Sequence, residues 1–119
     1  MRKRQFEALV REAIESIPDS FLDIMTNVDF QVRRWPLSRH LAGLEPGETL
    51  LGLYEGYPIT DAFDGNMAQP DIITIFQGPI EEICDTNAQV RAEVRDTVVH
   101  EVAHFFGISD AELHAWGLA

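Results

Sequence analysis

Two histidines and a glutamate follow one another in a pattern that could bind a metal ion and activate water. His100, Glu101 and His104 fall within five consecutive residues. Helical residues four apart lie on one face about one turn apart, so both imidazoles can reach one ion. Zn²⁺ accepts such nitrogen ligands, although these ligand types also admit other divalent ions. Glu101 projects about 100° away from His100 and is better placed to act as a base on bound water.

The residues after His104 offer a third ligand. Gly107 stands three positions further on, and Asp110 stands six positions further on. A straight helix would carry Asp110 away from the ion, but glycine can adopt positive φ and reverse the chain. Two His and one Asp would leave the fourth position for water, which is typical of catalytic zinc sites. His114 could be a rival ligand or could support Asp110 by contacting it, but a place on the surface of the last helix is favoured.

The element that must position these residues is a long helix from Asn87 to Phe106. Asp85, Thr86 and Asn87 are all plausible caps. Gly107 predicts a left-handed end, and a last helix is expected over Ser109–Trp116. The buried face of the long helix is expected to consist of apolar residues at helical spacing, namely Val90, Val94, Val98, Val102 and Phe105.

The rest of the chain predicts an α+β domain covering residues 1–119, with a small sheet of three strands packed on the metal-binding helix. Helices are expected over Arg2–Ile17, Asp19–Met25 and Gly78–Ile83, and strands over Val28–Trp35, Thr49–Tyr54 and Asp71–Gln77. His40 falls in a loop and is expected to be solvated. Cys84 is interpreted as a core residue, and Asp61 and Asp64 as part of a turn.

Composition narrows the class of protein and its partners. The chain carries 9 basic and 20 acidic residues, a formal net charge of −11. Such a surface repels phosphate backbones, which argues against nucleic-acid binding. No apolar stretch is long enough to cross a membrane, and a single cysteine cannot form an internal disulfide. We expect a cytoplasmic protein whose oligomeric state the sequence does not determine.

The segment His100-Glu101-x-x-His104-x-x-Gly107-x-x-Asp110 resembles the signature of zincin metallopeptidases, in the metzincin-like variant with Asp as third ligand. Within that group, the stretch HEVAHFFGISDAEL is similar to a short bacterial family of minimal metalloproteases. The resemblance implies a zincin-like α+β fold and zinc-dependent hydrolysis of a peptide or protein substrate. It also implies that His100, His104 and Asp110 bind zinc and that Glu101 is the general acid and base.

In the expected mechanism, zinc lowers the pKa of its bound water toward about 7 and Glu101 removes the proton. An extended peptide could pair with an exposed sheet edge, which the sequence does not identify. The nine residues after Asp110 include no Met, so the methionine turn and C-terminal subdomain of larger metzincins lack a counterpart. The alternatives are therefore a zincin-fold module that binds metal or a partner without turnover, and an acidic domain without a metal site.

Overall fold

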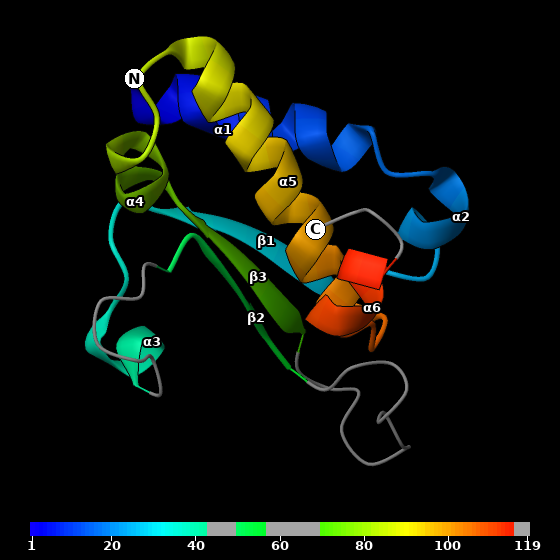
Figure 1. Ribbon diagram of the computed structural model, residues 1–119. Coiled ribbons are helices and arrows are strands. Elements are labelled where there is room, and N and C mark those ends of the chain that lie inside the picture. Colours follow the sequence, from blue (N-terminus) through cyan, green and yellow to red (C-terminus); the bar gives the residue numbers. More distant parts are fainter. Residues whose placement is uncertain (43–49, 57–69, 116–119) are drawn as a thin grey trace.

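The computed structural model describes residues 1–42, 50–56 and 70–115, apart from the side chains of Asp110, Leu113 and His114. Its α+β architecture, drawn in Figure 1, is the predicted one. The elements in chain order are α1 (Lys3–Glu15), α2 (Asp19–Leu22), β1 (Val28–Arg33), α3 (Ser38–Leu41), β2 (Gly52–Glu55), β3 (Asp71–Phe76), α4 (Gln77–Glu82), α5 (Asn87–Phe105) and α6 (Asp110–Ala115).

The sheet has three strands in the order β1-β3-β2. β1 runs parallel to β3, whereas β2 runs antiparallel to it, with Gly52 opposite Ile75 and Tyr54 opposite Ile73. Side chains alternate between the faces of a strand, so these four residues share one face. The central strand β3 is apolar on both faces, as its sequence predicts, and Ile73, Ile75 and Phe76 are fully buried.

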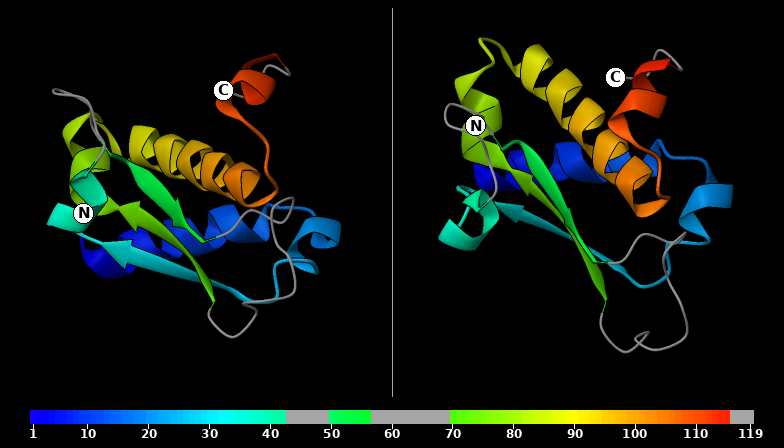
Figure 2. Two further views of the ribbon diagram at one scale, coloured as in Figure 1. Left: turned by 90° about the horizontal axis from the view of Figure 1, so that it is seen from below. Right: turned by 60° about the horizontal axis from the view of Figure 1, so that its bottom comes forward.

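The helices α1 and α5 cover the face of the sheet that carries Ile73 and Ile75, and Figures 1 and 2 show the two helices crossing over it. β2 is the strand that packs most extensively against α5. The core is formed by apolar side chains from these layers and from the segments beside them, among them Phe6, Val10, Ala13, Ile73, Ile75, Ile80, Val90, Val94, Val98 and Val102. The helix α5 is thus anchored along most of its length by buried apolar contacts.

The N-terminal end of α5 is capped by Thr86. Its hydroxyl accepts a hydrogen bond from the backbone N–H of Gln89 (3.1 Å), and the Gln89 side chain accepts one from the Thr86 N–H (3.2 Å). This reciprocal pair is a capping box, and it selects Thr86 among the three residues that the sequence offered. The buried face of α5 contains two polar residues, Thr97 and Glu101, besides the apolar ones that were predicted.

Two expectations were wrong. The segment after Pro36 contains a short helix, α3, and His40 within it is buried with 4% of its surface exposed. Its neighbours come from β2 and β3, which local sequence does not reveal. Ile83 is exposed, and Cys84 lies only half-buried at the edge of the core, where burial and the nearby carboxylates of Glu93 and Asp85 raise the pKa of its thiol.

Several expectations lie outside the described residues: the loop at residues 43–48, the start of the second predicted strand at Thr49, the turn with Asp61 and Asp64, and the end of the last helix at Trp116. In the described part of the chain, no helix combines the length and the apolar character needed to cross a bilayer.

Candidate metal centre

His100, Glu101 and His104 come together near the C-terminal end of α5. One potential ligand atom from each lies within 4.8 Å of the other two. The two imidazole rings meet edge to face, with centroids 4.6 Å apart. In the described part of the chain, no other group of three His, Cys, Asp or Glu side chains gathers this closely. Two imidazoles are donors that zinc accepts, and a carboxylate beside them can act on bound water, so these residues fit a zinc ion.

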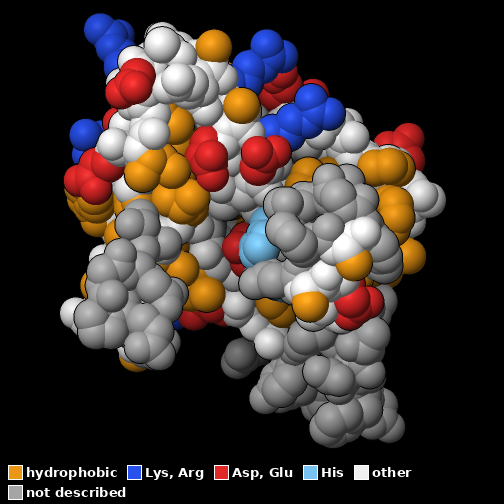
Figure 3. Space-filling model, in the orientation of Figure 1, with side chains coloured by type: hydrophobic (Ala, Val, Ile, Leu, Met, Phe, Trp, Pro, Cys, Tyr) orange, Lys and Arg blue, Asp and Glu red, His pale blue; other side chains and the backbone are white. Residues whose placement is uncertain are grey.

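The three side chains differ in their exposure to solvent. Glu101 is buried, with 6% of its surface exposed, whereas both histidines are half-buried. Oε1 of Glu101 lies 3.1 Å from Nδ1 of His104. In Figure 3, a histidine side chain is visible in a hollow of the surface, next to acidic side-chain atoms. Because a buried carboxylate is costly without a cationic or hydrogen-bonding partner, this position favours a nearby imidazole or cation.

Glu101 is buried because β2 passes directly over it. Gly52 faces α5, and a Cβ built on it would lie 2.6 Å from Cγ2 of Thr97 and 3.2 Å from Cγ of Glu101. The sequence analysis did not identify Gly52 as a functional residue. A glycine inside a strand pattern is nevertheless a known sign of close backbone approach, and it could have drawn attention to this position.

The helix ends as the sequence predicts, at a left-handed glycine. Gly107 has a φ of 74°. The N–H of Ile108 donates to the carbonyl of Ala103 (2.9 Å), and the N–H of Gly107 donates to the carbonyl of His104 (2.9 Å). These two bonds form a Schellman motif, which satisfies carbonyls at the end of the helix. The chain then turns back into α6, as both views in Figure 2 show.

The third ligand expected from the sequence follows this turn. Asp110 is the first residue of α6, and the helix is capped by Ser109, whose hydroxyl accepts from the N–H of Glu112 (3.1 Å). The Glu112 carboxylate in turn accepts a hydrogen bond from the Ser109 backbone N–H (3.3 Å), so the two residues form a capping box. The side chains of Asp110 and His114 lie outside the described residues, and their roles remain predictions.

Tyr54 lies on the same face of β2 as Gly52, two residues further along. Its ring packs edge to face against Phe105, with centroids 6.1 Å apart. Its hydroxyl donates a hydrogen bond to Oδ2 of Asp71 (2.6 Å). Burial raises the pKa of Tyr54, and the hydrogen bond and negative charge of Asp71 raise it further. The hydroxyl of Tyr54 therefore stays protonated and links β2 to β3 through Asp71. The ring links β2 to the last turn of α5 through Phe105.

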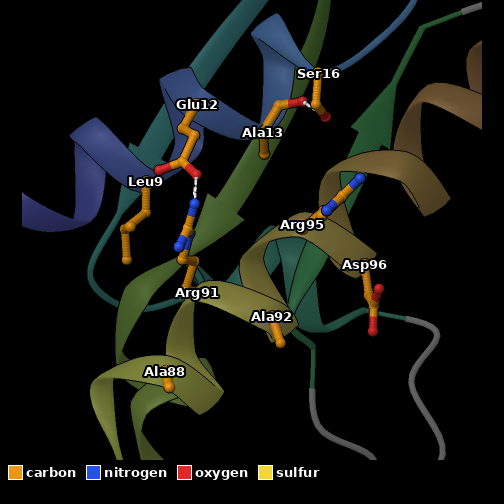
Figure 4. A pocket seen from close by; sticks show the side chains of 9 residues that line it. All are labelled: Leu9, Glu12, Ala13, Ser16, Ala88, Arg91, Ala92, Arg95 and Asp96. Carbon is orange, nitrogen blue, oxygen red and sulfur yellow. Dashed lines mark hydrogen bonds and ion pairs between the residues drawn. The ribbon is translucent and has the colours of Figure 1, made fainter.

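A separate groove of about 620 Å³ lies between α1 and the first half of α5 (Figure 4). An ion pair between Glu12 and Arg91 crosses it, and its lining contains no His or Cys. Leu9, Ala13 and Ala92 supply apolar parts of the wall. The groove does not include His100, Glu101 or His104, and its lining offers no comparable set of potential ligands.

Comparisons with known proteins point to one family and to a similar fold. A family model described as zincin-like metallopeptidase matches residues 25–118. A conserved hypothetical protein from Thermo thermophilus has a solved structure similar to this one, with a TM-score of 0.63 and 28% sequence identity. The similarity covers 89% of this chain and 94% of that chain. Among curated proteins, no relative matches the sequence.

Proposed function

Because the chain belongs to the zincin-like metallopeptidase family, we propose that it is a zinc-dependent hydrolase of peptide bonds. The observation that carries the proposal is the buried carboxylate of Glu101, 3.1 Å from His104 and beside two half-buried imidazoles. A buried carboxylate next to two partly exposed zinc ligands can remove a proton from a water molecule bound at the same site. We propose that the protein acts in the cytoplasm, where peptides and proteins are available as substrates.

The proposed zinc ligands are His100, His104 and Asp110. The first two are positioned by one face of α5, and the third follows the reversal of the chain at Gly107. When bound, zinc would supply a Lewis acid that polarises the scissile carbonyl and acidifies water. Two imidazoles and one carboxylate would leave a coordination position for that chemistry.

Glu101 has the role of general base and then general acid. Its carboxylate takes a proton from the attacking water while the water oxygen bonds to the carbonyl carbon. It then gives this proton to the amide nitrogen as the carbon–nitrogen bond breaks, so it ends in its starting state. Burial beneath β2 and contact with His104 hold the carboxylate in one place, which favours repeated proton transfer at one atom.

We propose β2 as the strand that binds substrate. It is the edge of the described sheet nearest the metal centre, and Gly52 lies against Glu101. The outer edge of such a strand can hydrogen-bond an extended peptide by strand addition. The scissile bond would then lie parallel to β2 and next to the end of α5.

The proposal is tested by zinc stoichiometry together with cleavage of a peptide library. Zinc-loaded wild type is expected to cleave library members, and Glu101→Gln to keep zinc while its kcat falls by about 10²–10⁴-fold. Glu12→Gln is a matched control, because Glu12 is also a carboxylate paired with a neighbouring side chain but faces the groove of Figure 4. A zinc-loaded wild type that cleaves no peptide would contradict the proposal and favour a binding module.

A further inference from the structure

β2 crosses α5 at a point where the strand has no side chain. Gly52 is buried, and its missing Cβ would point at the helix, between Thr97 and Glu101. These two residues are one helical turn apart, and each has only 6% of its surface exposed. The strand, the threonine and the glutamate therefore form one tightly packed contact directly behind the metal-binding residues.

The contact leaves no room for a methyl group. A Cβ on residue 52 would lie 2.6 Å from Cγ2 of Thr97, closer than real Cβ atoms come to other heavy atoms, and 3.3 Å from the backbone oxygen of Thr74. Thr97 is β-branched and lies in a helix, where its χ1 angle has few alternatives. Thr74 belongs to the central strand. With Thr97 in place, a side chain at position 52 must therefore push β2 away from α5 or displace the side chains of Thr97 and Glu101.

We propose that Gly52 is a positioning residue for Glu101. Its missing side chain lets Cγ of Glu101 lie against β2, and the carboxylate is thereby directed to His104. The contact also sets the distance between Glu101 and the strand that is proposed to bind substrate. The catalytic consequence rests on the proposed function, whereas the effect on the Glu101 carboxylate does not.

The first test is Gly52→Ala. A displacement of about 1 Å in a reacting group can cost about 100-fold in rate, so we expect a loss of kcat of that order. KM is expected to change less than kcat, because the side chain of residue 52 points toward α5 and not along the outer edge of β2. Zinc stoichiometry should stay at the wild-type value, because the side chain of residue 52 faces Thr97 and the Glu101 stem rather than the imidazoles.

A rescue variant separates positioning from simple loss of stability. Thr97→Ser removes the methyl group that makes the closest contact, so Gly52→Ala with Thr97→Ser should recover most of the lost kcat. Gly78→Ala is the matched control, because its Cβ would lie 2.7 Å from the Arg34 backbone oxygen and from Trp35. Gly78 lies in α4 and outside the metal centre, so this variant should be less stable but keep the wild-type kcat.

A measurement without substrate tests the same inference. The Nδ1 nitrogen of His104 can be followed by ¹⁵N NMR in the zinc-free protein, because it lies 3.1 Å from Glu101. Gly52→Ala should move this resonance toward its position in Glu101→Gln, and Thr97→Ser should restore it. If wild type cleaves no peptide, the proposed function fails but this experiment still decides on Gly52. An unchanged resonance in Gly52→Ala, or a kcat loss that Gly78→Ala shares and Thr97→Ser does not reverse, would overturn the inference.

Discussion

The described part of the chain contains two pairs of histidine and glutamate that differ in position, distance and exposure. His104 and Glu101 are three residues apart on α5, with Nδ1 and Oε1 3.1 Å apart, and the imidazole is one-third exposed. His40 and Glu55 come from α3 and β2, with Nε2 and Oε1 3.6 Å apart, and the His40 side chain is completely buried. The first pair has its acid inside and its imidazole at the surface, whereas the second has the opposite arrangement.

The second pair is closed by its surroundings. Nδ1 of His40 accepts a hydrogen bond from the N–H of Leu37 (2.8 Å), and the ring packs on Phe76 with centroids 5.2 Å apart. Arg39 pairs with the other oxygen of Glu55. Nε2 of His40 and Oε1 of Glu55 have no hydrogen-bond partner in the described part of the chain, but both atoms are buried, so a ligand cannot reach them. By contrast, the pair on α5 has a second imidazole beside it, and its own imidazole is one-third exposed to solvent.

The difference teaches that access and the number of donors, rather than the presence of His and Glu, distinguish a candidate metal centre from a structural contact. β2 connects the two pairs. Gly52 and Tyr54 face α5, and Glu55, on the opposite face of the strand, contacts α3. We therefore expect changes at the first pair to affect zinc binding (His104) or turnover (Glu101), and changes at the second pair to affect stability.

The largest expected effect on stability is that of His40→Ala. The substitution removes a buried ring from Phe76 and leaves the Leu37 N–H without its acceptor, so the free energy of unfolding should fall by about 3 kcal/mol. Urea denaturation would measure this loss. Zinc content of the folded protein should not change.

Arg39→Ala is the matched control for this pair. Arg39 contacts the same carboxylate but is 56% exposed, so its removal should cost less than about 1 kcal/mol. Two results would contradict the distinction between a structural pair and a metal-site pair. One is an equal loss of unfolding free energy in His40→Ala and Arg39→Ala, and the other is a loss of zinc from folded His40→Ala.

The smaller effect is that of Tyr54→Phe, which tests the tie between β2, β3 and α5. Loss of the hydrogen bond to Asp71 should lower the free energy of unfolding by about 1 kcal/mol at neutral pH. The pKa of Tyr54 is raised in the folded protein, whereas an unfolded tyrosine has a pKa of about 10. This stabilisation should be complete below pH of about 10 and decrease as the pH rises further.

Urea denaturation of wild type and Tyr54→Phe, at neutral pH and above the pKa of free tyrosine, would measure this difference. The variant should lose less stability than wild type on the change to alkaline pH. If both proteins lose the same free energy of unfolding, the hydroxyl of Tyr54 does not cause the expected loss of stability at alkaline pH.

The sequence predicted the parts of the molecule that depend on local pattern. The bounds of α5 follow from helical spacing between the capping residues and Gly107, and the central position of β3 follows from its continuous apolar residues. What it did not predict depends on contacts between distant segments. His40 is buried because it packs against Glu55 and Phe76, which are distant in the sequence. The need for glycine at position 52 follows only from its contacts with Thr97 and Glu101.

Zinc binding by histidine variants tests the central claim most directly. Wild-type protein, freed of metal and then titrated with Zn²⁺ in a calorimeter, is expected to bind one ion per chain. His100→Ala and His104→Ala should lose this binding while remaining folded, and His40→Ala should retain it. A wild type that binds no zinc, or a His104→Ala variant that binds it with unchanged affinity, would contradict the assignment of the metal centre to α5.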